Sequence, residues 1–243
     1  MLGCSLLALL LAGGAPPLPA FEQRTCPSSQ PIRGEAAGVA PLNDAEKHAE
    51  ALARAACFRG AMEAAAKDAT GLASQAQAAY AEWLRSACAL TEELSWADVQ
   101  ARLRRSGTRA GLGEAVCLAS GFGERAFFLR DRSGFDGVLH ERQAIGATIR
   151  VELARLLSLA RAEGRLPPSA APGALTASDL AKLTGAIDRV WEGAVEVAQA
   201  QCGALETPTS RCVALWENYL LGFVNPWALP GTPAPPPAPA AAD

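Results

Sequence analysis

The chain has 243 residues, of which 50% are hydrophobic and 19% are charged, so it can bury a core and is not intrinsically disordered. Its 25 acidic residues outnumber 22 basic ones, which excludes the basic excess expected of a nucleic-acid-binding protein. Alanine dominates the apolar residues and only 6% of the chain is aromatic. Because alanine is the best helix former and a poor strand former, this composition predicts an all-α bundle of about six to seven helices.

The N-terminus predicts export from the cytoplasm. Residues 2–12 (LGCSLLALLLA) form an apolar run, and small residues and prolines follow as far as Ala20. We therefore expect a signal peptide over residues 1–20 and a periplasmic or secreted protein. The apolar run is too short to span a bilayer. The alternative is a lipoprotein anchored in the envelope through Cys4, which is the one case in which we expect contact with a membrane.

The cysteines predict a disulfide framework. Removal of the signal peptide leaves six of them, which are Cys26, Cys57, Cys88, Cys117, Cys202 and Cys212. An even number in an exported chain favours disulfides, and six cysteines allow 15 connectivities. Among these connectivities we favour the pairing of neighbours along the chain. The predicted disulfides are Cys26–Cys57, Cys88–Cys117 and Cys202–Cys212. The alternative is that some of them are buried free thiols. The spacing contains no CxxC motif, so it predicts no zinc site and no redox pair.

The first helix follows a segment that carries little periodicity. Residues 21–42 predict an extended arm with several prolines. Asn43 can then cap a helix, because Glu46 stands three residues further on and completes a capping box. We expect Gly60 to interrupt this helix and a second helix to cover residues 61–89.

The middle of the chain predicts two more helices. Ser95, with an acidic residue three positions later, indicates the start of a third helix that ends at Ser106. A fourth helix covers residues 117–129. Residues 131–137 (DRSGFDG) predict a turn. Counted from the first aspartate, this segment lacks the ligand positions of a calcium loop.

The second half of the chain has a clearer helical periodicity. We expect helices over residues 138–162, 176–202 and 212–223, with a loop rich in proline and alanine over residues 166–173. The predicted organisation is a signal peptide (1–20), an extended arm (21–42), a cysteine-clipped helical domain (43–132), a C-terminal helical subdomain (133–225) and a disordered Pro/Ala-rich tail (226–243).

No complete catalytic, cofactor or metal motif is found. The only histidines are His48 and His140, and the second is not followed by another histidine as a zinc protease requires. The glycine-rich segment 104–113 (RRSGTRAGLG) lacks the GK[ST] ending of a phosphate loop. We therefore expect a protein that is not an enzyme and that binds no cofactor and no metal.

One segment resembles a known family. Gln77 is followed by an aromatic residue three positions later and by a cysteine eight positions after that. Further along the chain, a second cysteine is followed directly by a leucine. An arginine stands eight positions after that cysteine, and another leucine comes soon after the arginine. These residues are Gln77, Tyr80, Cys88, Cys117, Leu118, Arg125 and Leu129. Over about residues 57–130 the pattern resembles the N-terminal domain of LprI-type lysozyme inhibitors, in which tryptophan is usual at the position of Tyr80.

The resemblance implies a disulfide-stapled exported protein that binds a protein partner in the cell envelope, such as a lysozyme. The predicted contact surface lies between Cys88 and Cys117 and carries three arginines, which are Arg104, Arg105 and Arg109. The alternative is an envelope structural or assembly protein without inhibitory activity. Such a protein would use an exposed apolar patch to contact its neighbours.

Overall fold

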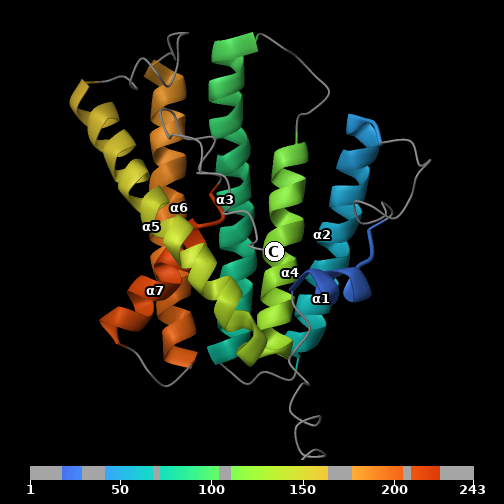
Figure 1. Ribbon diagram of the computed structural model, residues 1–243. Coiled ribbons are helices and arrows are strands. Elements are labelled where there is room, and N and C mark those ends of the chain that lie inside the picture. Colours follow the sequence, from blue (N-terminus) through green and yellow to red (C-terminus); the bar gives the residue numbers. More distant parts are fainter. Residues whose placement is uncertain are drawn as a thin grey trace, which may run out of the picture.

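The computed structural model describes residues 18–28, 42–67, 72–103, 111–163, 177–204 and 209–224. Within these ranges it contains seven helices and no strand (Figure 1). The helices are α1 (Leu18–Thr25), α2 (Asp44–Ala66), α3 (Leu72–Leu103), α4 (Leu112–Arg130), α5 (Arg132–Glu163), α6 (Ala177–Ala204) and α7 (Ser210–Leu221). The predicted all-α class is confirmed. The predicted tail, residues 226–243, lies outside the described residues.

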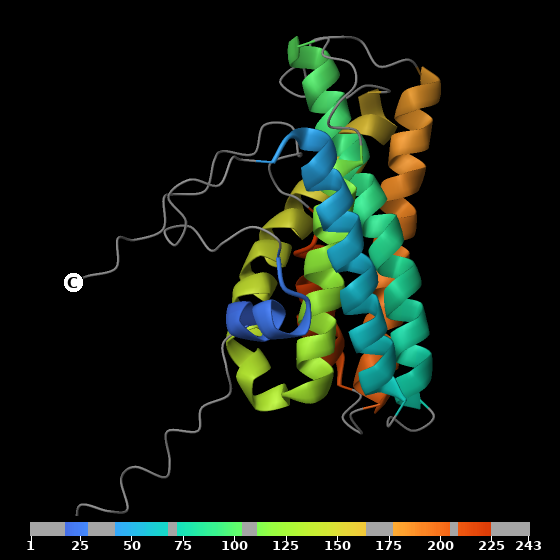
Figure 2. The ribbon, with the colours of Figure 1, turned by 90° about the vertical axis from the view of Figure 1, so that its right-hand side faces the viewer.

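The helices pack mainly in three pairs: α2 with α4, α3 with α6, and α5 with α7. Helices α2, α4, α3 and α6 stand side by side, whereas α1 lies crosswise over the bundle (Figures 1 and 2). A single hydrophobic core joins residues from Phe21 to Val224. This core therefore runs across the boundary at residues 132 and 133 that the sequence indicated between two helical units.

The start of α2 agrees with the prediction from the sequence, but its middle does not. The backbone N–H of Glu46 donates to Asn43 Oδ1 at 2.9 Å, and the backbone N–H of Asn43 donates to Glu46 Oε2 at 2.8 Å, so the predicted capping box is confirmed. The predicted interruption at Gly60 is wrong, because α2 continues to Ala66. A glycine costs a helix only about 1 kcal/mol. The buried face of α2, which includes Phe58, outweighs that cost.

Further boundaries differ from the prediction. Helix α3 continues through Ser95 without a new start, so the start predicted there is wrong. The second predicted helix, residues 61–89, is divided: its first residues belong to α2, and its part from Leu72 onward belongs to α3. The predicted turn over residues 131–137 is reduced to Asp131, since α5 begins at Arg132. Phe135 explains this last difference: it is 1% exposed and its ring centroid lies 5.1 Å from that of Phe128. Burial of one aromatic side chain contributes about 2–3 kcal/mol, more than the local turn preference of the segment.

The N-terminal part of the predicted extended arm is helical. Residues 21–25 belong to α1, which begins before the cleavage point expected at Ala20. Phe21 is buried against Phe127, with ring centroids 5.2 Å apart. Tertiary packing therefore orders a segment whose own sequence shows no clear periodicity.

The three predicted disulfides are confirmed. The Cα atoms lie 6.0 Å apart in Cys26–Cys57, 5.5 Å in Cys88–Cys117 and 6.0 Å in Cys202–Cys212, all within the range that a disulfide requires. A chain that carries three such bonds belongs in an oxidising compartment. Among the described residues, no helix is long and apolar enough to cross a membrane.

Candidate functional site

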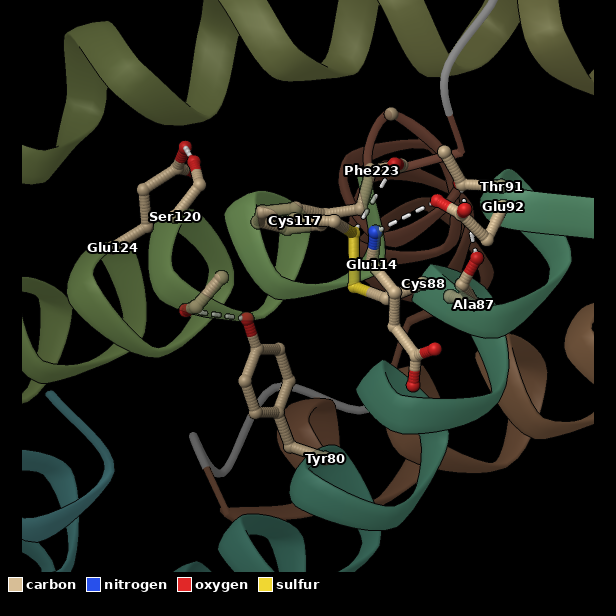
Figure 3. Close-up of a disulfide and its surroundings, with 12 residues drawn as sticks. Tyr80, Ala87, Cys88, Thr91, Glu92, Glu114, Cys117, Ser120, Glu124 and Phe223 are labelled. Atoms are coloured by element: carbon tan, nitrogen blue, oxygen red, sulfur yellow. Dashed lines mark hydrogen bonds between the residues drawn. A yellow bond between two sulfur atoms is a disulfide. The ribbon is translucent and has the colours of Figure 1, made fainter. Parts of the chain in front are cut away.

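The hairpin of α3 and α4 carries most of the residues that the sequence singled out. The Cys88–Cys117 disulfide joins the two helices (Figure 3). One turn beyond it, Glu92 on α3 caps the start of α4: its carboxylate accepts from the backbone N–H of Gly111 at 2.9 Å and of Glu114 at 3.2 Å. Gly111 has φ +81° and provides no side-chain cap, so a neighbouring helix supplies the acceptor. The end of the hairpin is thus fixed by a covalent bond and by a charged cap.

Further along the hairpin, Arg125 of α4 lies in the centre of the bundle and is only 1% exposed. Its Nε donates to Gln77 Oε1 on α3 at 2.6 Å, and its Nη2 donates to Gln201 Oε1 on α6 at 2.5 Å. Its guanidinium carbon lies 4.9 Å, 4.9 Å and 5.7 Å from the ring centroids of Tyr80, Phe128 and Trp216. We call these residues the arginine layer: Gln77, Tyr80, Arg125, Phe128, Gln201 and Trp216.

Tyr80 links the arginine layer to the backbone of α4. Its hydroxyl donates to the carbonyl oxygen of Gly121 at 2.8 Å (Figure 3). Complete burial raises the pKa of Tyr80 far above its ordinary value, although the Arg125 guanidinium opposes this shift. The phenol therefore stays protonated and keeps its role as a hydrogen-bond donor.

A second buried charge lies beside the arginine layer. Glu124 is 1% exposed and pairs with Arg142 of α5. The hydroxyls of Ser120 and Tyr219 donate to its two carboxylate oxygens, each at 3.4 Å. Burial raises the pKa of Glu124, while Arg142 and these hydrogen bonds act in the opposite direction. The pair and its hydrogen bonds join α4 to α5 and to α7, the helix that also supplies Trp216 to the arginine layer.

The structure brings the residues of the resemblance together. Gln77, Tyr80 and Arg125 meet in the arginine layer, and the two central cysteines form their bond. Leu118 and Leu129 are partly buried and pack against the core. The three predicted contact residues Arg104, Arg105 and Arg109 lie outside the described residues, in the segment that connects α3 to α4.

Sequence reasoning missed Glu124, Arg142 and Gln201. A signal for the first was present, because Glu124 and Arg125 interrupt an otherwise apolar run (GFGERAFF), and charged residues in such a run need partners when they are buried. Their partners carried no such signal: Gln201 lies 76 residues from Arg125 in the chain.

A groove of about 610 Å³ opens between α5 and α6, away from the hairpin. Trp191 is half-buried in its wall, and the remaining lining residues are Ala154, Leu157, Ser158, Arg161 and Ala162. Val151, further back along α5, is 66% exposed. Within the described part of the chain, no group of three or more His, Cys, Asp or Glu side chains is arranged to hold a metal ion.

The fold and the clipped hairpin define a disulfide-stapled, all-α protein of an oxidising compartment. No family model, no curated protein and no solved structure matches the chain.

Proposed function

We propose that the chain is an exported, non-enzymatic protein that binds a protein partner in the cell envelope, such as a lysozyme, in the manner of the LprI-type inhibitors. The observation that carries the proposal is the 2.6 Å hydrogen bond between Gln77 and Arg125 beneath the Tyr80 ring. These residues were singled out by their spacing alone, and they lie 48 residues apart in the chain. Their meeting in one layer supports the idea that the spacing describes a structural unit.

That unit is suited to the presentation of a binding segment. The α3–α4 hairpin is held at three levels along its length: the Glu92 cap, the Cys88–Cys117 bond and the arginine layer. A rigid support lowers the entropy lost on binding, because the two helices that flank the contact segment are already held in place. The segment between the two helices contains the three predicted contact residues, Arg104, Arg105 and Arg109.

The chemistry of a lysozyme cleft fits such a segment. Glycoside hydrolases cleave their substrate with a pair of carboxyl groups in an open cleft. An arginine guanidinium can form two parallel, charge-assisted hydrogen bonds with a carboxylate. The cationic segment would therefore occupy the cleft and exclude the polysaccharide, with no chemical step by the chain itself.

A lysozyme turbidity assay tests this proposal. Purified oxidised protein should inhibit cell-wall lysis in a dose-dependent way, and the Arg104→Glu, Arg105→Glu and Arg109→Glu triple variant should lose that inhibition. Arg59→Glu is the matched control, since Arg59 is an exposed arginine on α2. Circular dichroism of each variant shows whether the helices are retained. No inhibition of several lysozyme types by folded protein would contradict the proposal.

The groove between α5 and α6 favours a second candidate, an envelope assembly protein. Its apolar lining and the exposed Val151 offer a surface for a neighbouring helix. Cross-linking in the envelope tests this function. We expect Trp191→Ala to weaken the cross-links to a neighbour, while the arginine triple variant leaves them intact. The reverse result would assign partner binding to the hairpin.

A further inference from the structure

The three disulfides differ in their exposure to solvent. Cys57 is an exposed residue on α2, whereas its partner Cys26 is only 2% exposed. Each of the other two bonds joins one fully buried cysteine to one half-buried cysteine, Cys88 to Cys117 and Cys202 to Cys212. Thiol–disulfide exchange requires an attacking thiolate to reach one sulfur of the bond. Cys57 therefore offers an external thiol the most accessible sulfur of the three bonds.

The accessible bond is also the one that holds the smallest element. It ties the end of α1 to α2, whereas the other two bonds join α3 to α4 and α6 to α7, helices that are all longer than α1. Helix α1 has eight residues, and a helix of that length is not stable alone in water. Besides the disulfide, it is held by the packing of Phe21 on Phe127 and by the ion pair of Glu22 with Arg54, at 3.4 Å.

Helix α1 covers the middle of α4. It lies crosswise to the long helices in Figure 2 and contacts α2 and α5 as well as α4. A Cβ atom added at Gly123 would lie 3.2 Å from Glu22 Oε1, so the Glu22 side chain of α1 lies against the α4 backbone there. The next two residues of α4 are Glu124 and Arg125, the charged residues of the buried layers. Loss of α1 would expose the apolar side chain of Phe127 and bring water close to the Glu124–Arg142 pair.

We propose that Cys26–Cys57 is a thiol–disulfide exchange site, and that its reduction by an envelope dithiol releases α1 and uncovers α4. The dithiol attacks Cys57 Sγ as a thiolate and forms a mixed disulfide, while Cys26 leaves as a thiolate and takes up a proton. The second thiol of the dithiol then displaces Cys57, which is protonated in turn. Two electrons reach the chain, and the dithiol ends as a disulfide. The Cys88–Cys117 bond stays intact and continues to clip the hairpin.

Limited reduction with mass mapping tests which bond reacts. The oxidised full chain is treated with a limiting dithiol, quenched with an alkylating reagent and digested. We expect Cys26 and Cys57 to be labelled roughly ten-fold faster than the other four cysteines, because access governs the rate. Faster labelling of either other pair, or equal labelling of all three pairs, would overturn the proposal.

Hydrogen exchange tests the structural consequence. After limited reduction, amides of α1 and of the α4 segment around Phe127 should lose protection, while α3 around Cys88 keeps it. The Cys26→Ser/Cys57→Ser variant should show the same pattern without any reductant, and Cys202→Ser/Cys212→Ser is the control that leaves α1 protected. Full protection of α1 after cleavage of its bond would show that the disulfide is not its tether, and the proposal would fail.

Discussion

Replacement of Arg125 by methionine tests whether the arginine layer stabilises the fold. Methionine keeps much of the buried volume but removes the donors that face Gln77 Oε1 and Gln201 Oε1. It also removes the cation that lies over three aromatic rings. The single variant therefore removes from two buried amide oxygens the hydrogen bonds that Arg125 donates to them.

The size of the effect follows from opposing contributions. Each buried acceptor that loses its donor costs about 1–3 kcal/mol, and the lost cation–π contacts add about 1–2 kcal/mol. Removal of a buried charge relieves a desolvation penalty of several kcal/mol. We expect Arg125→Met to lower the free energy of unfolding by about 3 kcal/mol, which corresponds to about 6–12 °C in melting temperature. The triple variant with Gln77→Leu and Gln201→Leu should recover to within about 1 kcal/mol of the parent.

Chemical denaturation followed by circular dichroism gives these free energies, with all disulfides kept oxidised in every variant. The comparison of single and triple variants is the decisive one, because the triple variant removes the polar groups together with the charge. An Arg125→Met variant as stable as the parent would refute the claim that the layer contributes to stability. A triple variant no better than the single one would show that packing, not hydrogen bonding, causes the loss.

Three further predictions concern other contacts of the bundle. A Cβ at Gly146 would lie 1.6 Å from the carbonyl oxygen of Asn218, so Gly146→Ala should force α5 and α7 apart and cost about 1–3 kcal/mol or more in thermal unfolding. Gly137 is also in α5, but a Cβ added there would have nothing within 4 Å, so Gly137→Ala should stabilise the folded protein by about 0.5–1 kcal/mol. Equal effects of the two substitutions would contradict the close approach of α7 to Gly146. Because the pKa of Glu124 is raised above 4.5 in the folded state, the folded protein holds its proton more tightly, and the contribution of Glu124 to stability falls as pH rises through the folded pKa. The free energy of unfolding should therefore decline as the pH rises above 4.5, and this decline should be smaller in Glu124→Gln, whereas parallel curves would refute this. Glu92→Ala should cost about 1 kcal/mol and increase hydrogen exchange at the start of α4, while unchanged exchange there would exclude the cap.

The sequence predicted what local chemistry determines. The Asn43 capping box and the pairing of neighbouring cysteines depend on short-range signals, and both are confirmed. Helix ends were less predictable. Gly60 and Ser95 are ordinary signals for a break and for a start, but α2 and α3 continue past them, and α2 has buried residues on both sides of Gly60. A penalty near 1 kcal/mol cannot end a helix that buries several side chains on either side.

The candidate site was predictable only in part, for a related reason. The helical spacing of Gln77 and Tyr80 placed both on one face of α3, and Arg125 was part of the same pattern. Gln201 and Arg142 are brought to the site by α6 and α5, through the tertiary packing of helices. No local signal in their own segments distinguishes them from solvent-exposed polar residues, so only the three-dimensional fold assigns them to the site.

The two adjacent charges of α4 fix the rotation of that helix. Successive residues of a helix point about 100° apart. Arg125 donates to α3 and α6 and lies over Trp216 of α7, while Glu124 pairs with Arg142 of α5 and accepts from Tyr219 of α7. A rotation of α4 by one residue would bury both charges away from their partners, at a cost of several kcal/mol. An apolar layer would pack with similar energy but would not distinguish these orientations. We therefore expect the triple variant of the arginine layer to stay folded yet lose dispersion in its amide NMR spectrum. Sharp, dispersed signals would show that the contacts left in the variant, among them the Cys88–Cys117 bond and the Glu124–Arg142 pair, set the orientation of α4 without the arginine layer.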